Sequence, residues 1–232
     1  MKAIILCAGL GTRLRPYTFN NPKVMLPIKG KPLLQYHIEN LKEFGIKEIG
    51  INLHYLPEKI INYFGDGKKF GVNIHYSNEK KMRGTSGAVR QFKKWLKGED
   101  FFVIYGDNYS HFNYDKILEY FQSKANSLGI ICLLKSDKLK GKGLVKLNRA
   151  GKITFFVEKP KNPEDYNTNF TNAGIYCFKN EILKYIPNQL PSDFSIDVFP
   201  NILKKGLSLY GHHLKNNFFY DIGTTFVYES VK

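Results

Sequence analysis

Cysteine, arginine and long apolar runs are all scarce in this sequence of 232 residues. The three cysteines, Cys7, Cys132 and Cys177, lie far apart in apolar segments, so we expect buried reduced thiols and neither a disulfide framework nor a zinc site. The apolar run from Ala3 to Ala8 is far shorter than the ~20 residues that span a bilayer. These absences exclude a disulfide-stapled fold and a helix that crosses a membrane, and we expect no membrane partner.

The start of the chain also lacks the pattern of a signal peptide. Met1 and Lys2 precede a short apolar run that breaks at once into a glycine loop at Gly9, from which we expect a cytoplasmic location. The composition itself is that of a folded domain, because 43% of the residues are hydrophobic and Phe and Tyr are abundant. This content is ample for a core and excludes disordered and fibrous classes.

Only five of the 35 basic residues are arginines, although the formal net charge is +15. A strong positive charge is one sign of a nucleic-acid-binding protein. The lysines, however, are spread along the chain and form no single tract, which favours a diffuse field that attracts small anions. We therefore expect no nucleic-acid partner and keep phosphate ligands in view.

The first half of the chain alternates apolar runs with segments of helical periodicity, which is typical of a parallel sheet with crossover helices and predicts an α/β fold. The predicted strands are Lys2 to Ala8, Lys47 to Leu53, Val72 to Tyr76, Phe101 to Tyr105 and Leu128 to Leu134. The predicted helices are Pro32 to Phe44, Pro57 to Phe64, Ser86 to Leu96 and Tyr114 to Ser123.

After Gly141 the pattern changes to a hairpin, with strands at Gly143 to Asn148 and Lys152 to Glu158, followed by a loop at Lys159 to Asn169 that we expect to be a lid or to face the substrate. The remaining predicted elements are a strand at Asn172 to Phe178, a helix near Asp193 to Leu203, strands at Ser208 to His212 and Phe218 to Ile222, and a short helix after Gly223. The hairpin is expected to join the same sheet.

A glycine loop follows the first predicted strand and reads Gly-Leu-Gly-Thr-Arg from Gly9 to Arg13. Glycines there allow backbone N–H groups to approach an anion, and parallel sheets bind ligands at the carboxyl ends of their strands. The spacing matches neither the P-loop nor the GxGxxG fingerprint. From the glycines alone, a phosphate site and a plain strand-to-loop turn are equally good interpretations.

The whole segment from Gly9 to Leu34, GLGTRLRPYTFNNPKVMLPIKGKPLL, is more specific, because it resembles the signature GxGTRLxPxTxxxPKxxxPxxxKPxL of the sugar-1-phosphate nucleotidyltransferases. The resemblance continues in order through Phe70-Gly71-Val72, Glu79, Gly84 to Ala88, Gly106-Asp107-Asn108, Gly143, Val157 to Pro160, Asn172 to Tyr176 and Tyr220 to Thr224. It covers nearly the whole chain, and the sequences of these motifs are most similar to those of the mannose-1-phosphate and manno-heptose 1-phosphate guanylyltransferases.

The resemblance implies a three-layer, Rossmann-like α/β fold, with a mixed, mostly parallel sheet and crossover helices. It also implies one catalytic domain over 1–232, with a nucleotide-binding half at about 1–125 and a sugar-binding half at about 126–232. The implied reaction joins a nucleoside triphosphate to a sugar 1-phosphate, giving a nucleotide-sugar and pyrophosphate. These two ligands are the expected partners, and GTP with a mannose or manno-heptose phosphate is the favoured pair. Whether the chain forms a homo-oligomer is left open.

By the same resemblance, Arg13, Lys23, Asp107 and Asp221 are the catalytic residues. Arg13 and Lys23 match the basic pair that neutralises the triphosphate. Asp107 and Asp221 each follow a predicted strand, where two carboxylates with nucleotide oxygens and waters suit Mg²⁺, the expected cofactor. A lone aspartate at such a position more often caps a helix, but the pairing of these two within the ordered motifs favours the metal site.

The remaining implied site residues fall into two groups. The nucleotide-binding group is Leu6, Ala8, Gly9, Gly11, Thr12, Glu79, Gly84 and Thr85. The sugar-phosphate-binding group is Gly143, Glu158, Lys159 and Asn172. Adjacent strand residues point to opposite faces, so Glu158 and Lys159 reach one site together only if the backbone twists or bulges at Pro160.

Other functions remain open from the sequence. A uridylyl-, thymidylyl- or cytidylyltransferase of the same fold would carry the same cations. A non-catalytic subunit that senses nucleotide-sugars is a second alternative, against which the complete set of cations and carboxylates argues. Nucleic-acid binding is a third alternative, and it predicts an affinity that falls steeply with salt.

Overall fold

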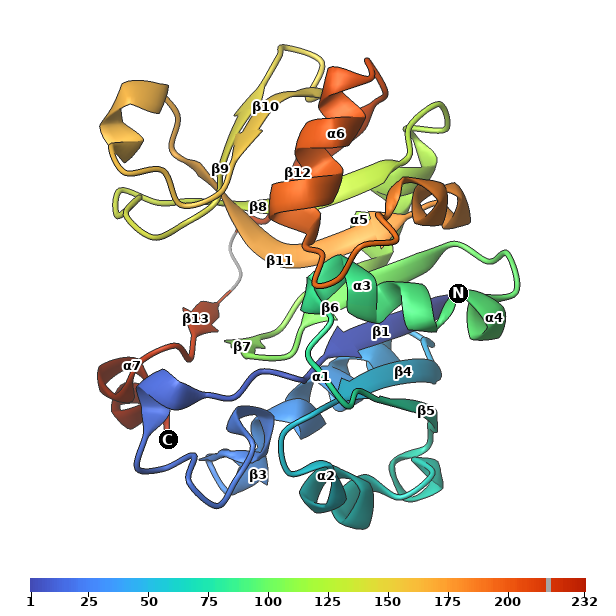
Figure 1. Ribbon diagram of the computed structural model, residues 1–232, viewed down its shortest axis with the longest axis vertical. Coiled ribbons are helices and arrows are strands. Elements are labelled where there is room, and N and C mark those ends of the chain that lie inside the picture. The colour runs from blue at the N-terminus through green and yellow to red at the C-terminus, as the bar shows by residue number, and fades with distance from the viewer. Residues whose placement is uncertain (216–217) are drawn as a thin grey trace. The chain divides into compact units, whose positions relative to one another are not determined.

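The computed structural model describes residues 1–215 and 218–232, which form two compact units (Figure 1). Among the described residues, the first unit contains 1–82, 104–114 and 218–232, and the second contains 83–103 and 115–215. Each unit is therefore built from segments that are distant in the sequence. The assignment of a nucleotide half and a sugar half concerns ligands and stays a prediction.

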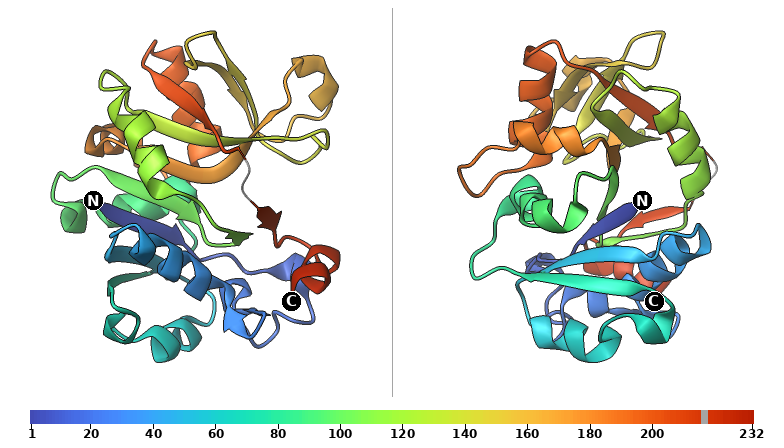
Figure 2. Two further views of the ribbon diagram at one scale, coloured as in Figure 1. Left: turned by 180° about the vertical axis from the view of Figure 1, so that it is seen from behind. Right: turned by 90° about the vertical axis from the view of Figure 1, so that its right-hand side faces the viewer.

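The first unit contains a parallel sheet with crossover helices. Its main strands are β1 (Lys2–Leu6), β4 (Glu48–Leu53) and β5 (Asn73–Asn78), and its crossover helices are α1 (Leu33–Glu43) and α2 (Pro57–Phe64). Both pairs of neighbouring strands are parallel, with Ile4 opposite Gly50 and Gly50 opposite His75. The helix α1 lies along one face of the β1 and β4 strands (Figure 2). These elements confirm the predicted alternation of strands and helices.

The sequence explains these elements locally. One face of α1 is buried and carries Leu33, Leu34, His37, Ile38 and Leu41, which recur at the three- and four-residue spacing of an amphipathic helix. A proline occupies the first turn of α2, where its missing N–H costs no hydrogen bond. Strand β1 ends earlier than predicted because the N–H of Cys7 donates to the side chain of Asn52, at 2.7 Å, instead of joining a ladder.

Short elements that the sequence analysis did not predict complete the first unit. They are the 3₁₀ turns η1 (Thr12–Leu14), η2 (Lys23–Met25) and η3 (Lys68–Phe70), the hairpin of β2 (Pro27–Ile28) with β3 (Lys31–Pro32), and β7 (Asn108–Ser110). The predicted C-terminal elements are present as β13 (Phe219–Asp221) and α7 (Thr225–Val231). Strand β13 pairs with β7 in a separate two-stranded ribbon.

The second unit combines a mixed sheet with short helices. Its strands are β8 (Gly129–Lys135), β9 (Leu144–Leu147), β10 (Ile153–Val157), β11 (Phe170–Phe178) and β12 (Leu209–His213). Its helical elements are α3 (Gly84–Gln91), α4 (Lys93–Leu96), α5 (Tyr114–Gln122), η4 (Pro163–Tyr166), η5 (Asn180–Tyr185), η6 (Phe194–Val198) and α6 (Phe199–Lys204). Strand β11 is antiparallel to β8 and β9, the predicted hairpin β9–β10 is present, and β12 is parallel to β8.

An aromatic cluster forms much of the core of the second unit. Tyr176 and Phe178 of β11 pack against Phe194 and Phe199, with ring centroids 5.2–6.1 Å apart. The single helix predicted near Asp193 to Leu203 is instead a π-helical turn followed by α6, and both of the helix-borne rings of this cluster come from that junction. The irregular helix thus aims two large side chains at one strand.

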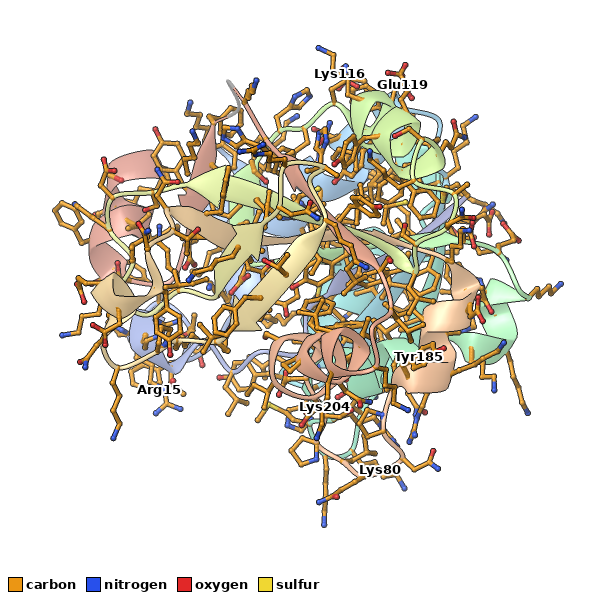
Figure 3. All side chains as sticks on the ribbon, turned by 90° about the horizontal axis from the view of Figure 1, so that it is seen from above. Arg15, Lys80, Lys116, Glu119, Tyr185 and Lys204 are labelled. Carbon is orange, nitrogen blue, oxygen red and sulfur yellow. The ribbon has the colours of Figure 1, made fainter. Side chains whose placement is uncertain are left out.

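The cysteines are free and buried, as predicted, and burial raises the pKa of all three thiols. Charged side chains project from many elements, as Lys80, Lys116 and Lys204 illustrate in Figure 3, which fits a diffuse positive field. Across residues 1–215 and 218–232, no helix combines the length and apolar character needed to cross a bilayer.

Candidate active site

Asp107 stands at the carboxyl end of β6 (Phe101–Tyr105), the apolar strand whose two bounds the sequence predicts. The preceding Gly106 donates its N–H to Leu6 O at 3.0 Å, and an added Cβ there would stand 2.9 Å from the same oxygen. Only glycine allows so close an approach between the ends of β6 and β1. The backbone of Asp107 in turn accepts from Ile222 N at 3.2 Å, which ties it to the end of β13.

Lys23 joins the two carboxylates. Its Nζ atom lies 2.8 Å from Asp107 Oδ2 and 4.0 Å from Asp221 Oδ1. The lysine side chain is only 9% exposed, whereas the exposed fractions of the Asp107 and Asp221 side chains are 39% and 65%. One ammonium group is therefore fixed between two carboxylates that solvent still reaches.

Arg13 approaches the same place from the glycine loop. An added Cβ on Gly223 would lie 3.0 Å from Asp221 Oδ1 and 3.5 Å from Arg13 Nη2, so both groups converge on the turn that follows β13. The structure thus brings together all four residues that the resemblance assigns to catalysis. Their chemical roles stay a prediction.

Two carboxylates from different strands are a donor set that fits Mg²⁺, because this ion usually takes one or two protein carboxylates and completes its octahedron with phosphate oxygens and waters. In the part of the chain that the structure describes, no group of three or more His, Cys, Asp or Glu side chains is placed to hold a metal. A site that needs its substrate to complete the coordination is consistent with both observations.

The glycine loop turns sharply because Gly11 has a left-handed backbone, with φ of 64°. An added Cβ would stand 3.0 Å from Thr18 Cγ2, and the Thr18 hydroxyl donates to Gly11 O at 2.8 Å. Around Gly9, by contrast, nothing lies within 4 Å of where a Cβ would stand. Gly9 and Thr12 are exposed near Arg13, whereas Leu6 and Ala8 are half-buried, and the predicted part of these residues in nucleotide binding is untested.

Glu79 follows β5 and is held by a chain of hydrogen bonds. Its Oε1 accepts from Asn52 Nδ2 at 2.9 Å, and Asn52 Oδ1 accepts from Cys7 N at 2.7 Å. The Glu79 backbone bonds to Leu53 O through its N–H and to the ring of His54 through its carbonyl. Asn52 was missed by the sequence analysis, although a polar residue inside the buried run Ile49 to Leu53 is a usable signal.

In the second unit, Gly84 and Thr85 begin α3 and contact the segment before η6. Gly84 has a left-handed backbone, and an added Cβ would stand 2.3 Å from Ser192 O. The Thr85 hydroxyl donates to Asp193 Oδ1 at 2.9 Å and accepts from Phe194 N at 3.0 Å. Both residues therefore have structural contacts within their own unit, and their predicted part in nucleotide binding is untested.

The four predicted sugar-phosphate residues also gather in the second unit. A Cβ on Gly143 would stand 2.6 Å from Glu158 Oε2 and 3.4 Å from Asn172 Cβ, and Asn172 N donates to Gly143 O at 2.9 Å. Lys159 Nζ lies 3.3 Å from Glu158 Oε1. The backbone turn lies at Lys159, which has a left-handed φ of 46° directly after β10 has ended, and not at Pro160 as expected.

His37 is a further residue that the sequence analysis did not single out. It lies on the buried face of α1, 2% exposed, against the backbone of Gly106 and Asn108 on either side of Asp107, while its Nε2 makes no hydrogen bond of normal geometry. Burial lowers the pKa of His37 from 6.5 to about 4. A histidine on an otherwise apolar helix face is the sequence signal for such a residue.

This shift has a consequence for stability in acid. In the unfolded chain His37 becomes protonated below about pH 6.5, whereas in the folded protein it stays neutral down to about pH 4. The free energy of unfolding therefore falls as the pH is lowered across that interval. Denaturant unfolding without metal or ligand should lose ~3 kcal/mol between pH 7 and pH 4 from this group. In His37→Gln this part of the pH dependence should disappear, and an unchanged acid slope would contradict the assignment.

A family model described as "Nucleotidyl transferase" matches residues 2–231. Among curated relatives, the bifunctional protein GlmU of Methanococcus maripaludis is 37% identical over 96% of this chain and 51% of its own length. UTP–glucose-1-phosphate uridylyltransferase of Synechocystis is 34% identical over 90% of this chain and 57% of its own length. Mannose-1-phosphate guanylyltransferase 1 of Arabidopsis thaliana is 34% identical over 87% of this chain and 56% of its own length.

Two solved structures cover nearly all of the chain. One is a putative glucose-1-phosphate thymidylyltransferase from Bacillus anthracis, with a TM-score of 0.89, 25% identity, and 100% of this chain and 93% of that chain covered. The other is HddC from Yersinia pseudotuberculosis complexed with GMP-PN, with a TM-score of 0.81, 27% identity, and 99% and 97% covered. They confirm the Rossmann-like, mixed and mostly parallel α/β fold.

The chain spans about half the length of the curated relatives it matches, and those relatives differ in their named nucleotide and sugar. The match to the family model, by contrast, runs over almost every residue, including Arg13, Lys23, Asp107 and Asp221. The chain belongs to the nucleotidyl transferase family, as the resemblance of its glycine loop and later motifs predicts.

Proposed function

We propose that this protein transfers a nucleotidyl group from a nucleoside triphosphate to a sugar 1-phosphate, releasing pyrophosphate. The observation that carries the proposal is the convergence of Arg13, Lys23, Asp107 and Asp221 at one edge of the first unit. Two cations and two carboxylates beside an exposed glycine loop are the groups that a triphosphate and its metal need.

In this reaction a phosphate oxygen of the sugar 1-phosphate attacks the α-phosphorus, and the bond from that phosphorus to the pyrophosphate oxygen breaks. No protein nucleophile is needed, so catalysis comes from in-line alignment and from neutralising charge on the phosphate oxygens. Arg13 supplies a planar guanidinium that binds two phosphate oxygens, and Lys23 supplies a compact charge. Mg²⁺, held by Asp107 and Asp221, would neutralise the triphosphate and orient its α-phosphate.

Lys23 also prepares the site for the metal. With its ammonium 2.8 Å from Asp107 Oδ2 and 4.0 Å from Asp221 Oδ1, it offsets the repulsion between the carboxylates and fixes their separation before the nucleotide arrives. The arrangement lowers the reorganisation that the reaction needs.

For the base, the proposal is GTP, and it is argued from Glu79, a residue that is only 3% exposed and whose Oε1 already accepts from Asn52 Nδ2, so the base would have to reach the remaining edge of the carboxylate. A carboxylate can only accept hydrogen bonds, so it pairs best with two neighbouring donors. Guanine offers such a pair in N1–H and its exocyclic amino group. In uracil, thymine, adenine and cytosine an acceptor lies beside the donor and would be repelled by the second carboxylate oxygen. The HddC structure with GMP-PN, at 27% identity, is a further support for a guanine nucleotide.

For the second substrate, the proposal is mannose 1-phosphate or manno-heptose 1-phosphate, bound at Gly143, Glu158, Lys159 and Asn172. A carboxylate accepts from sugar hydroxyls, and a lysine ammonium binds the phosphate. The 34% identity to the plant mannose-1-phosphate guanylyltransferase supports this choice. Because the GlmU and uridylyltransferase relatives are similarly identical, the test below also includes other pairs of nucleotide and sugar phosphate. Nucleotide-sugars of this kind feed glycan assembly.

The testing experiment measures pyrophosphate release with Mg²⁺ for GTP, UTP, dTTP, CTP and ATP, each against hexose and heptose 1-phosphates. We expect one productive pair with GTP, and none without the sugar phosphate. A productive pair with another nucleotide would overturn the choice of base but not the reaction. Binding of a nucleotide-sugar with no turnover for any pair would favour a sensing subunit instead.

The sugar-phosphate assignment makes a separate prediction at Gly143. In Gly143→Ala the new Cβ would stand 2.6 Å from Glu158 Oε2, so the carboxylate must move. We expect the KM for the sugar phosphate to rise by about 10-fold or more, with the KM for the nucleotide unchanged. Gly141→Asn is the matched control, because nothing lies within 4 Å of that position and asparagine tolerates its left-handed backbone. Equal KM values in both variants would contradict the assignment.

A further inference from the structure

The loop that carries Arg13 and Lys23 has little regular structure of its own. Between β1 and β2 it contains only the two three-residue turns η1 and η2. Tyr55 holds part of it, since its hydroxyl bonds to Thr18 O at 2.9 Å and Phe19 O at 2.8 Å. The positions of the two cations therefore depend on tertiary contacts around the loop.

A buried apolar cluster lies beneath the four proposed catalytic residues. Its members are Leu14, Leu26, Ile28, Leu33, Tyr109, Ile222, Tyr228 and Val231. Leu14 follows Arg13 directly and Ile222 follows Asp221 directly. Leu26 and Tyr109 stand three and two residues after Lys23 and Asp107. The same cluster thus connects the backbone beside every member of the site.

The helix α7 closes this cluster with Tyr228 and Val231. The Tyr228 hydroxyl also donates to Pro27 O at 3.0 Å, and its ring makes an edge contact with the Tyr17 ring at 5.0 Å between centroids. Tyr17 donates its hydroxyl to Glu229, and Lys232 lies 5.6 Å over the Tyr17 ring. One short helix therefore contacts the loop between the two cations, at Tyr17, and the first residue of β2 after the loop, at Pro27.

We propose that α7 is a positioning element, which holds the loop so that Arg13 and Lys23 meet Asp107 and Asp221. Tyr228 and Val231 are its positioning residues, and neither touches the reacting atoms. The inference rests on the proposed function for its effect on turnover, but its structural part does not. Reacting groups must be held to within about half an ångström, so loosening the helix costs rate before it costs the fold.

The test uses the whole 232-residue chain, with two substitutions on the inner side of α7 and one on its outer side. Val231→Ala removes apolar contacts from the cluster, and Tyr228→Phe removes only the hydroxyl that bonds to Pro27 O. Phe226→Ala is the matched control, because that side chain is 82% exposed on the same helix. Amide hydrogen exchange of ligand-free protein and steady-state kinetics are both measured well below the unfolding temperature.

In the two inner variants, exchange should become about 10-fold faster or more in residues 9–26, and stay unchanged in β1 and β4. The kcat should fall by about 10-fold, while the KM of the nucleotide changes little. The control should match the wild type in both measurements. Unchanged exchange in residues 9–26 would overturn the proposal, and so would faster exchange spread evenly over the first unit. If no substrate pair is turned over, the proposed function fails, and the exchange data alone still decide the positioning role.

Discussion

Asp107→Asn should lower kcat by about 10²- to 10³-fold, while the protein remains folded. Asparagine keeps the shape of the side chain and one oxygen that can accept from the Lys23 ammonium. In the wild type this ammonium lies 2.8 Å from Asp107 Oδ2. It removes the negative charge that, with Asp221, would hold Mg²⁺ against the triphosphate. Because the ion would neutralise charge that develops in the transition state, we expect the loss mainly in kcat.

A metal titration separates this interpretation from a structural one. In the Asp107→Asn variant, the Mg²⁺ concentration for half-maximal rate should rise, and excess Mg²⁺ should restore part of the activity. The matched control is Asp66→Asn, which changes an exposed aspartate of the same unit whose partner, Lys68, lies 3.0 Å away. A variant with normal turnover, or one with the same Mg²⁺ dependence as the wild type, would remove Asp107 from the metal site.

The elements that the sequence predicts well are those with a strong local pattern. Strand β6 combines five apolar residues between Asp100 and Gly106, and α2 begins at a proline, so their bounds follow from composition alone. Strand β7 has no such pattern, because Asn108 to Ser110 is polar and only three residues long. Strand β7 pairs with β13, which lies more than a hundred residues later in the chain, and a local sequence rule does not detect such a partner.

The candidate site likewise has features that the sequence predicts and features that it does not. Motif resemblance alone gathers Arg13, Lys23, Asp107 and Asp221, because it matches positions across the chain without regard to their separation. It does not predict that Lys23 stands between the two carboxylates, nor that Asn52 holds Glu79, because both facts depend on side-chain geometry at the strand ends. The backbone turn at Lys159 is a third example, since a positive φ at a lysine has no signature in composition.

Glu79→Gln should have the largest effect on substrate choice. Glutamine has nearly the same size, and its carbonyl oxygen can still accept from Asn52 Nδ2, so the hydrogen bonds from Cys7 to Glu79 are kept. Its amide nitrogen, however, is a donor where the carboxylate had an acceptor. A donor beside an acceptor complements uracil and thymine and opposes the two neighbouring donors of guanine.

We therefore expect kcat/KM for GTP to fall by about 10²-fold or more, and the values for UTP and dTTP to rise relative to it, because an unpaired or repelled buried polar group is costly. Glu58→Gln on α2 makes the same chemical change on an exposed side chain, and should leave the nucleotide preference as in the wild type. If Glu79→Gln lowered the rate with every nucleotide equally, Glu79 would support the fold of this edge without reading the base. The choice of GTP would then lose its main physical argument, while the reaction proposed for Arg13, Lys23 and the two aspartates would be unaffected.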